Sequence, residues 1–437
     1  MKRFKINTLG CKVNQCESDA LVQCLRSAGW TPVQGDETAD LCIINTCTVT
    51  HKASMQSRQA ARRAIRGNPE ARVLVTGCYA QTEPEAIARI EGVDTIVGHG
   101  EKHRIPELVD LTPDETIDGL PATHCPNIGQ ERTFRQIPLA EIGARTRPFL
   151  KIQDGCDAFC TYCIVPHARG RSRSLAPEAV LDSIRALAGS GYHEVVLSGV
   201  HLGCYGMDLT PKTDLFALLQ EIDREGAVDR VRISSIEPHE LSREIIDLAA
   251  GSERFCRHFH IPLQSGDDKI LERMGRPYTR ADFGDLVRRI RTRIPDAGVC
   301  ADVLVGFPGE SDAAFSNTYD LVQELPITYL HVFPFSPRKG TPAATFSDPV
   351  PVDTVKQRCK QLRELGTAKK RAFLERFPGK TMTVLVETRR DRKTGLLKGI
   401  TSNYLAVLLN GGDKLQNRLI EVKIESVKRD VLIGAEG

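Results

Sequence analysis

The chain has 437 residues, which is more than one ordinary domain needs, so two or three domains are expected. Hydrophobic residues make up 41% and charged residues 26% of the sequence, which is the balance of a folded globular protein. No apolar run approaches the roughly 20 residues that span a bilayer, and the N-terminus lacks an apolar secretion signal. A formal net charge of +3 is too small to indicate nucleic-acid binding by itself. We therefore expect a cytoplasmic protein without a membrane partner.

The first 105 residues alternate short apolar runs with amphipathic, helix-like stretches. The apolar runs are 4–10, 41–46, 73–77 and 95–98, and the helical stretches are 17–29, 55–66 and 83–91. This alternation predicts an N-terminal α/β domain over 1–105, built as an open parallel sheet with helices on its faces. Residues 106–144 are polar and weakly periodic, and are predicted to be a connector.

A second alternation occupies residues 145–376. Its predicted strands are 148–153, 194–199, 230–236, 259–264, 300–307 and 329–335, with helical patterns such as 176–191 and 213–226 between them. Six such units predict a partial (β/α)6 barrel rather than a closed eightfold one. The last segment, 377–437, has short strands separated by Gly, Asn and Asp turns, which predicts a small all-β barrel.

Three cysteines lie close together in the segment GCDAFCTYC, at Cys156, Cys160 and Cys163. The spacing of three and two lets one loop hold three corners of a 4Fe–4S cubane through thiolates. A fourth ligand is missing, so one iron is left open for a small molecule. The alternative is zinc, which prefers four ligands at paired spacings, but no second Cys-x-x-Cys lies nearby.

Three other cysteines share a position relative to the predicted strands. Cys11, Cys47 and Cys78 each follow the end of one strand of the N-terminal domain. Because the carboxyl ends of parallel strands meet at one edge of a sheet, these thiols are expected to converge there. Cysteine is also a common buried residue, so the spacing alone leaves a second metal cluster and ordinary burial both open.

The motifs around these cysteines resemble a known family. Cys-x-x-x-Cys-x-aromatic-Cys, with Tyr162 as the aromatic residue, resembles the radical S-adenosylmethionine (SAM) superfamily. NTLGCKVNQCES, NTCTVTHKA and VTGCYAQ resemble the N-terminal signature of radical-SAM methylthiotransferases, and the likeness runs through the whole chain. The terminal barrel is similar to the TRAM module of that family.

This resemblance implies two 4Fe–4S clusters and SAM as cofactors. Cys156, Cys160 and Cys163 would hold the catalytic cluster that cleaves SAM, and Cys11, Cys47 and Cys78 would hold an auxiliary cluster that delivers sulfur. Further SAM contacts are expected at strand ends, from Ser198, Gly199, Glu237 and Gln264. Glu237 and Gln264 are equally explained as loop caps or as satisfied polar core residues. No role is predicted for His201, His258 or His260.

The opening LGCKVNQ resembles the branch of the family that acts on threonylcarbamoyladenosine-37 of tRNA. Other branches act on isopentenyladenosine-37 of tRNA or on an aspartate of a ribosomal protein, and both remain alternatives. The implied partners are a tRNA anticodon stem-loop and an electron donor of unknown identity. The tail from Lys380 onward is net positive, and candidate RNA contacts are Arg389, Arg390, Arg392 and Lys393.

Two alternative functions, from other classes of protein, also remain open. The chain could be a non-catalytic RNA-binding scaffold whose cysteines hold structural zinc, or a radical-SAM enzyme of other chemistry with a vestigial N-terminal domain. Metal content separates the first from an iron–sulfur enzyme, and cysteine replacement separates the second.

Overall fold

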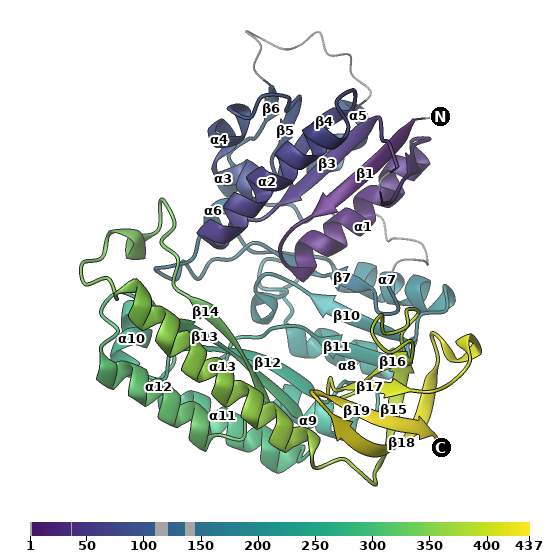
Figure 1. Cartoon of the computed structure of the whole chain (residues 1–437), viewed down its shortest axis with the longest axis vertical. Coiled ribbons are helices and arrows are strands. Elements are labelled where there is room, and N and C mark those ends of the chain that lie inside the picture. Colours follow the sequence, from purple (N-terminus) through teal and green to yellow (C-terminus); the bar gives the residue numbers. More distant parts are fainter. Residues whose placement is uncertain (1, 36, 110–120, 136–144) are drawn as a thin grey trace. The chain divides into compact units, whose positions relative to one another are not determined.

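The structure is a computed structural model, and it describes residues 2–35, 37–109, 121–135 and 145–437 (Figure 1). Two compact units are present, and each is described by itself. The first contains residues 1–141, 151–175 and 336–345, and the second contains 142–150, 176–335 and 346–437. Most of the predicted connector, 110–120 and 136–144, lies outside the described residues. Within the described parts, no helix combines the length and apolarity needed to cross a membrane.

The first unit is built on a six-stranded parallel sheet, in the order β2-β1-β3-β4-β5-β6. Its strands are β1 (Arg3–Thr8), β2 (Thr31–Pro32), β3 (Leu41–Thr46), β4 (Arg72–Gly77), β5 (Thr95–Val97) and β6 (Ala122–His124). Its helices are α1 (Lys12–Ser27), α2 (His51–Gly67), α3 (Cys78–Thr82), α4 (Pro84–Ala88) and α5 (Ile105–Leu108). The predicted parallel α/β sheet is confirmed. Strands β2 and β6 were not predicted, and β6 falls in the segment interpreted as a connector.

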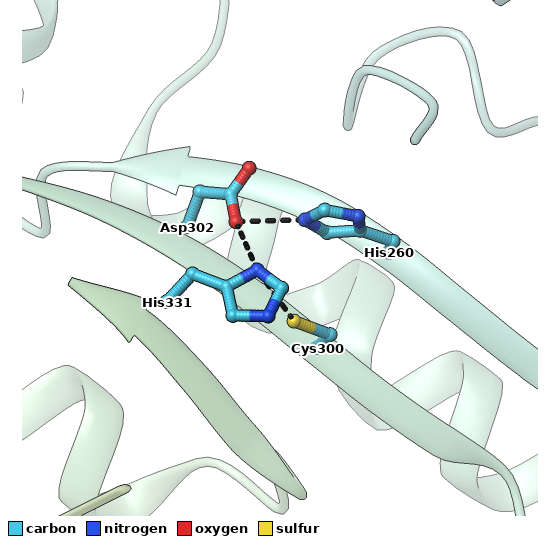
Figure 2. A group of neighbouring side chains, drawn as sticks. All are labelled: His260, Cys300, Asp302 and His331. Atoms are coloured by element: carbon cyan, nitrogen blue, oxygen red, sulfur yellow. Dashed lines mark hydrogen bonds and ion pairs between the residues drawn. The ribbon is translucent and has the colours of Figure 1, made fainter. Parts of the chain in front are cut away.

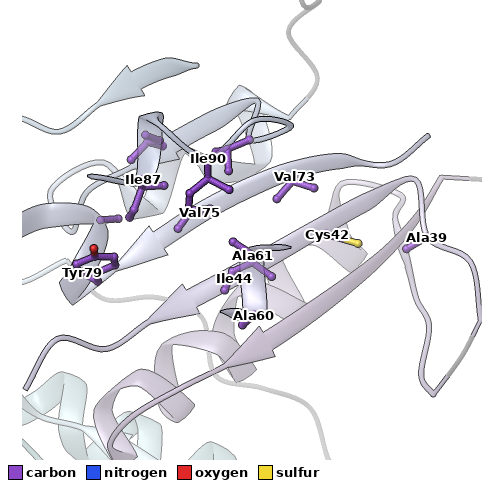
Figure 3. Close-up of a cluster of buried hydrophobic side chains, with 13 residues drawn as sticks. Ala39, Cys42, Ile44, Ala60, Ala61, Val73, Val75, Tyr79, Ile87 and Ile90 are labelled. Atoms are coloured by element: carbon purple, nitrogen blue, oxygen red, sulfur yellow. The ribbon is translucent and has the colours of Figure 1, made fainter. Parts of the chain in front are cut away.

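Helices cover both faces of this sheet. Alternate strand residues such as Cys42 and Ile44 pack against Ala60 and Ala61 of α2 in one core (Figure 3). The intervening residues, for example Ile43, point to the opposite face and pack with α1. Burial on both faces explains why these strands are continuous apolar runs in the sequence.

The rest of the first unit includes a short insertion that carries the central cysteines. Strands β8 (Gln153–Asp154) and β9 (Arg173–Ser174) form a two-residue antiparallel ladder, and α6 (Val165–Arg169) lies between them. The loop from 155 to 164 is therefore held at both ends by backbone pairing.

The second unit contains two three-stranded sheets, β11-β10-β7 and β12-β13-β14, in which β10 pairs with β11, β12 with β13, and β13 with β14, all in parallel. A bridge between Ser235 and His260 joins the two sheets, which gives the predicted six-stranded partial barrel. The strands are β7 (Phe149–Lys151), β10 (Glu194–Ser198), β11 (Arg230–Ile233), β12 (His258–Gln264), β13 (Gly298–Val305) and β14 (Tyr329–Pro334). The helices are α7 (Pro177–Gly189), α8 (Leu215–Glu225), α9 (Arg243–Gly251), α10 (Asp268–Arg273), α11 (Arg280–Arg293), α12 (Asp312–Glu324) and α13 (Val352–Leu374).

The C-terminal strands form a closed barrel in the order β15-β16-β17-β19-β18, as predicted. They are β15 (Thr381–Val386), β16 (Leu397–Thr401), β17 (Ala406–Leu409), β18 (Leu419–Lys428) and β19 (Val431–Glu436). The turn after β16 is held by two arginines from the start of β11. Arg230 donates to the carbonyl of Ile400 at 3.2 Å, and Arg232 donates to the carbonyl of Ser402 at 2.9 Å.

Candidate iron–sulfur sites

The first unit contains all six cysteines that were predicted to hold clusters. Strands β1, β3 and β4 are neighbours in the sheet, and their registers pair Thr8 with Asn45 and Thr46 with Gly77. Parallel neighbours lie roughly 4.8 Å apart, so the loops that follow these three strands start side by side. The structure therefore brings the positions after these strands, where Cys11, Cys47 and Cys78 stand, to one edge.

Two glycines let these loops approach one another. A Cβ added to Gly10 would lie 2.9 Å from the Cβ and 3.0 Å from the Sγ of Cys47. A Cβ added to Gly77 would lie 2.5 Å from the carbonyl oxygen of Thr46. Both glycines have positive φ, +102° and +97°, a region that side chains disfavour. Only glycine fits directly before Cys11 and Cys78, and the sequence has glycine at both positions, in LGC and TGC.

Asn14, from α1, ties the three loops together. Its amide nitrogen donates to the carbonyls of Leu9 at 2.7 Å and Thr46 at 2.9 Å, and its Oδ1 lies 3.9 Å from the Sγ of Cys78. The side chain is fully buried. Because a buried amide must satisfy its donors and acceptor, Asn14 holds the loops before Cys11 and Cys47 in one arrangement. Its importance was missed in the sequence, where it lies in KVNQ without a distinguishing spacing.

The thiols of this site are buried to different degrees. Cys11 is exposed, whereas Cys47 and Cys78 are buried. Burial raises the pKa of the Cys47 thiol, and burial together with the neighbouring Cys47 and Cys11 thiols raises the pKa of Cys78 to about 12. Binding of a cation would favour the thiolate forms that burial disfavours.

A buried ionic network lies beside the N-terminal cysteines. Arg169, at the end of α6, donates to Glu17 and Asp154 at 2.9 Å each and to Asn14 at 2.6 Å. Lys102 lies 2.6 Å from the Glu17 carboxylate. Burial alone would raise the pKa of Glu17, but Arg169, Lys102 and Lys151 hold it well below its usual value.

The charges of this network do not cancel among themselves. Three cations, Arg169, Lys102 and Lys151, face two carboxylates, Glu17 and Asp154. Burial would lower the pKa of Arg169, but Glu17 and Asp154, followed by Cys78 and Cys11, raise it well above its usual value. An excess positive charge suits a cubane held by three thiolates, which is anionic. The donor set and its surroundings therefore fit an iron–sulfur group.

The Cys156, Cys160 and Cys163 loop has its own backbone supports. The amide of Cys156 donates to the carbonyl of Gly170 at 3.0 Å, and the amide of Cys163 donates to the carbonyl of Cys160 at 2.9 Å. Gly155 has φ +76°, and a Cβ there would lie 1.9 Å from the carbonyl oxygen of Arg171. Cys156 and Cys163 are partly buried, Cys160 is buried, and all three stand on a loop whose shape the backbone specifies.

The ionic network also joins the two groups of cysteines within this unit. Asp154 precedes Cys156 by two residues, and Arg169 ends the helix that follows Cys163. Their partners Glu17 and Asn14 lie on α1, which begins directly after Cys11. Glu17, Asp154 and Arg169 were not predicted as site residues from the sequence. Glu17 and Arg169, which form a hydrogen bond, are 152 positions apart in the chain.

The four expected SAM contacts lie in the second unit, at or just after strand ends. Ser198 ends β10 and is buried, and Gly199 follows it. Glu237 lies beyond the end of β11, and its carboxylate accepts a hydrogen bond from Arg276. Gln264 ends β12 with φ +62°, next to an irregularity in strand pairing at Pro262.

Two family descriptions match the chain. Residues 3–98 match "Uncharacterized protein family UPF0004", and residues 150–322 match "Radical SAM superfamily". A protein of Bacillus subtilis named threonylcarbamoyladenosine tRNA methylthiotransferase MtaB is 39% identical over 97% of this chain and 94% of its own length. The chain belongs to the radical-SAM methylthiotransferase family. SAM and an iron–sulfur cluster are therefore cofactors of this methylthiotransferase.

Other relatives also align with this methylthiotransferase over nearly its whole length. A protein of Aquifex aeolicus with the same name as the Bacillus one is 35% identical over 97% of this chain and 100% of its own. A tRNA-2-methylthio-N(6)-dimethylallyladenosine synthase of Pelotomaculum thermopropionicum is 35% identical over 99% and 97%. Among solved structures, the radical SAM methyltransferase TsrM of Kitasatospora setae aligns with TM-score 0.57 and 17% identity over 83% of each chain, which supports the fold.

Proposed function

We propose that this methylthiotransferase adds a methylthio group to C2 of N6-threonylcarbamoyladenosine at position 37 of tRNAs that read codons beginning with A. The observation that carries the proposal is the full-length likeness to proteins named for that reaction, at 39% identity over 97% of the chain. Four of the relatives in this comparison from other bacteria carry the same name. The motif LGCKVNQ at the first cysteine supports the same branch.

The proposed cofactors are two 4Fe–4S clusters and SAM. Cys156, Cys160 and Cys163 would hold the cluster that binds SAM, and Cys11, Cys47 and Cys78 would hold the auxiliary cluster. When bound, these groups supply the radical that activates the carbon and the sulfur that is inserted. The chain contributes three thiolates to each group, which leaves one iron of each cubane open.

The surrounding residues keep these thiolates in place. Gly10 and Gly77 allow the loops to meet, and Asn14 holds two of the loops by hydrogen bonds. Arg169 supplies positive charge beside the N-terminal thiolates. At the strand ends of the second unit, Ser198, Gly199, Glu237 and Gln264 are the proposed SAM contacts. Arg276 orients the Glu237 carboxylate in this proposal.

The proposed RNA partner is the anticodon stem-loop of tRNA. Arg389, Arg392 and Lys393 are exposed in the turn after β15 and are available to phosphates. Arg390 instead donates to the carbonyls of Gly395 and Gly411, both at 2.9 Å. We assign Arg390 to the shape of the turn rather than to RNA. The reaction also needs an external electron donor, and we place the protein in the cytoplasm, where tRNA is modified.

A second candidate substrate is dimethylallyladenosine-37 of tRNA. The Pelotomaculum relative, named for that product, is 35% identical over nearly the whole chain. The two substrates share the adenine C2 position and differ in the group on N6, so their reactions use the same cofactors.

Nucleoside analysis of tRNA tests the substrate directly. A strain without this gene should lack 2-methylthio-N6-threonylcarbamoyladenosine and should accumulate the form without the methylthio group, as measured by mass spectrometry. The wild-type gene on a plasmid should restore the product. An unchanged methylthio-threonylcarbamoyladenosine peak would refute the proposal, and a missing methylthio-dimethylallyladenosine peak would establish the second candidate instead.

A further inference from the structure

Four potential metal ligands converge inside the partial barrel of the second unit, and none of them is one of the six cluster cysteines. They are His260 of β12, Cys300 and Asp302 of β13, and His331 of β14 (Figure 2). One ligand atom from each residue lies within 4.8 Å of the other three. No role was predicted for His260 from the sequence, and the four residues were not recognised as a set, because they lie on three different strands with helices between them.

The strand pairing explains why these side chains meet. The register places Cys300 beside His260 and Asp302 beside His331. Their neighbours in sequence, such as Phe259, Val299 and Ala301, are buried on the other face of the sheet. Since side chains alternate between faces along a strand, the four ligands share the inner face of the barrel.

The contacts of the four residues meet at one point. His260 Nε2 lies 2.7 Å and His331 Nδ1 lies 3.0 Å from the same carboxylate oxygen, Oδ1 of Asp302. The Cys300 Sγ lies 3.6 Å from the same His331 nitrogen. Figure 2 shows the imidazole rings of His260 and His331 turned toward the same carboxylate oxygen of Asp302.

This arrangement matches the requirements of a divalent transition metal. Zinc bonds to His, Asp and Cys at about 2.0–2.3 Å in a tetrahedron, so its ligand atoms are separated by roughly 3.3–3.7 Å. The contacts of 2.7, 3.0 and 3.6 Å reach that range after small side-chain movements. Two histidines and one carboxylate are also a common set for other divalent metals. His331 is exposed, which gives a metal a path to the site.

The charge of the group also favours a cation. One carboxylate oxygen of Asp302 lies within hydrogen-bond distance of both His260 and His331, so a negatively charged oxygen stands at the centre of the group. Carboxylate oxygen, thiol sulfur and imidazole nitrogen are all ligand atoms that zinc binds.

We propose that His260, Cys300, Asp302 and His331 form a zinc-type metal site that ties together β12, β13 and β14 on the inner face of the barrel. The proposal uses none of the six cluster cysteines, and the inference does not depend on which nucleoside is the substrate. Its ligands complete a four-coordinate set, which is typical of a zinc ion that stabilises a fold.

The test measures zinc bound to the iron-loaded protein by equilibrium dialysis and elemental analysis. The wild type should hold one more zinc per chain than Asp302→Asn and His331→Gln, in which the affinity should fall at least 100-fold. Asn keeps an acceptor oxygen for both imidazoles, so Asp302→Asn preserves the hydrogen bonds and removes the charge. Zinc should also raise the melting temperature of the wild type, but not that of either variant.

The matched control is His193→Gln, because His193 forms a comparable 2.5 Å contact with Asp229 on the surface. This variant should retain the zinc, and all variants should retain the same iron content as the wild type. Equal zinc content in the wild type, Asp302→Asn and His331→Gln would overturn the proposal. Loss of zinc in His193→Gln as well as in the two site variants would also overturn it.

Discussion

Gly10 lets the loop before Cys11 approach Cys47 closely, because glycine has no side chain. Its φ of +102° is unfavourable for other residues, and an added Cβ would meet Cys47 at 2.9 Å. Gly29 is a natural comparison, because its φ is +84° but nothing lies within 4 Å of an added Cβ. Comparing alanine substitutions at Gly10 and Gly29 therefore separates the cost of backbone strain from the cost of a clash with Cys47.

Gly10→Ala is expected to lose the auxiliary cluster while the catalytic cluster remains. Iron should fall from about 8 to about 4 atoms per chain after anaerobic reconstitution, as expected for one 4Fe–4S cubane instead of two. Gly29→Ala should show only the backbone cost of roughly 1 kcal/mol in the free energy of unfolding and should keep its iron. If Gly10→Ala binds as much iron as the wild type, the close packing of this loop is not required for the cluster.

At the same scale, the sequence predicted some site residues and missed others. The six cysteines could be chosen because their spacing or their place after a strand carries the chemistry. Asn14, Glu17 and Arg169 could not, because polar residues on a helix usually face solvent and only the folded chain shows these three to be buried. His260 and His331 were equally hidden, since cross-strand registry alone brings them together.

At the scale of elements, α1 and α6 are joined by the Arg169 network. Removing one partner of a buried ion pair leaves the other charges without compensation, which typically costs about 3–5 kcal/mol. Arg169→Met should therefore lower the free energy of unfolding by about that amount in chemical denaturation. Arg169→Lys should restore part of the loss.

Arg171 provides the control for this prediction, since it lies two residues further along and pairs with Asp157 at the surface. Exposed pairs contribute about 0–1 kcal/mol, so Arg171→Met should leave the stability nearly unchanged. Similar losses in Arg169→Met and Arg171→Met would mean that the buried network has no special weight.

The joint between the partial barrel and the C-terminal barrel should respond to acid. Burial would raise the pKa of Glu194, but Arg232 and Arg230 lower it to about 2. In the unfolded chain this carboxyl protonates near pH 4.3, so its contribution is complete above that pH. The contribution of about 3 kcal/mol should be lost as the pH falls from about 4.3 to about 2.

Glu194→Gln should remove this part of the acid dependence and should destabilise the protein at neutral pH, as followed by circular dichroism. Glu425 is exposed on β18, so Glu425→Gln should unfold with acid as the wild type does. An unchanged acid profile in Glu194→Gln would show that the two arginines do not stabilise the ionised carboxylate.

For the whole molecule, the fold class was predictable because each layer leaves a periodic pattern in the sequence. All six strands of the partial barrel were predicted as apolar segments. The closed barrel was predicted as four strand segments, because the last of them, 418–434, runs through both β18 and most of β19 without a clear break. The short strands β2 and β6 were not, because two or three edge residues bury too little apolar surface to stand out. The sequence also did not predict that residues 151–175 and 336–345 belong to the first unit. That assignment depends on contacts between residues far apart in the chain.

The central claim is that two groups of three cysteines perform separate parts of one reaction. Its most direct test is a reconstituted variant in which Cys11, Cys47 and Cys78 are all replaced by Ala, incubated with SAM, reductant and tRNA. The variant should bind about 4 iron atoms, still form 5′-deoxyadenosine from SAM, and yield no methylthio nucleoside. Wild-type protein should yield both products. Formation of the methylthio nucleoside by the variant would contradict the account.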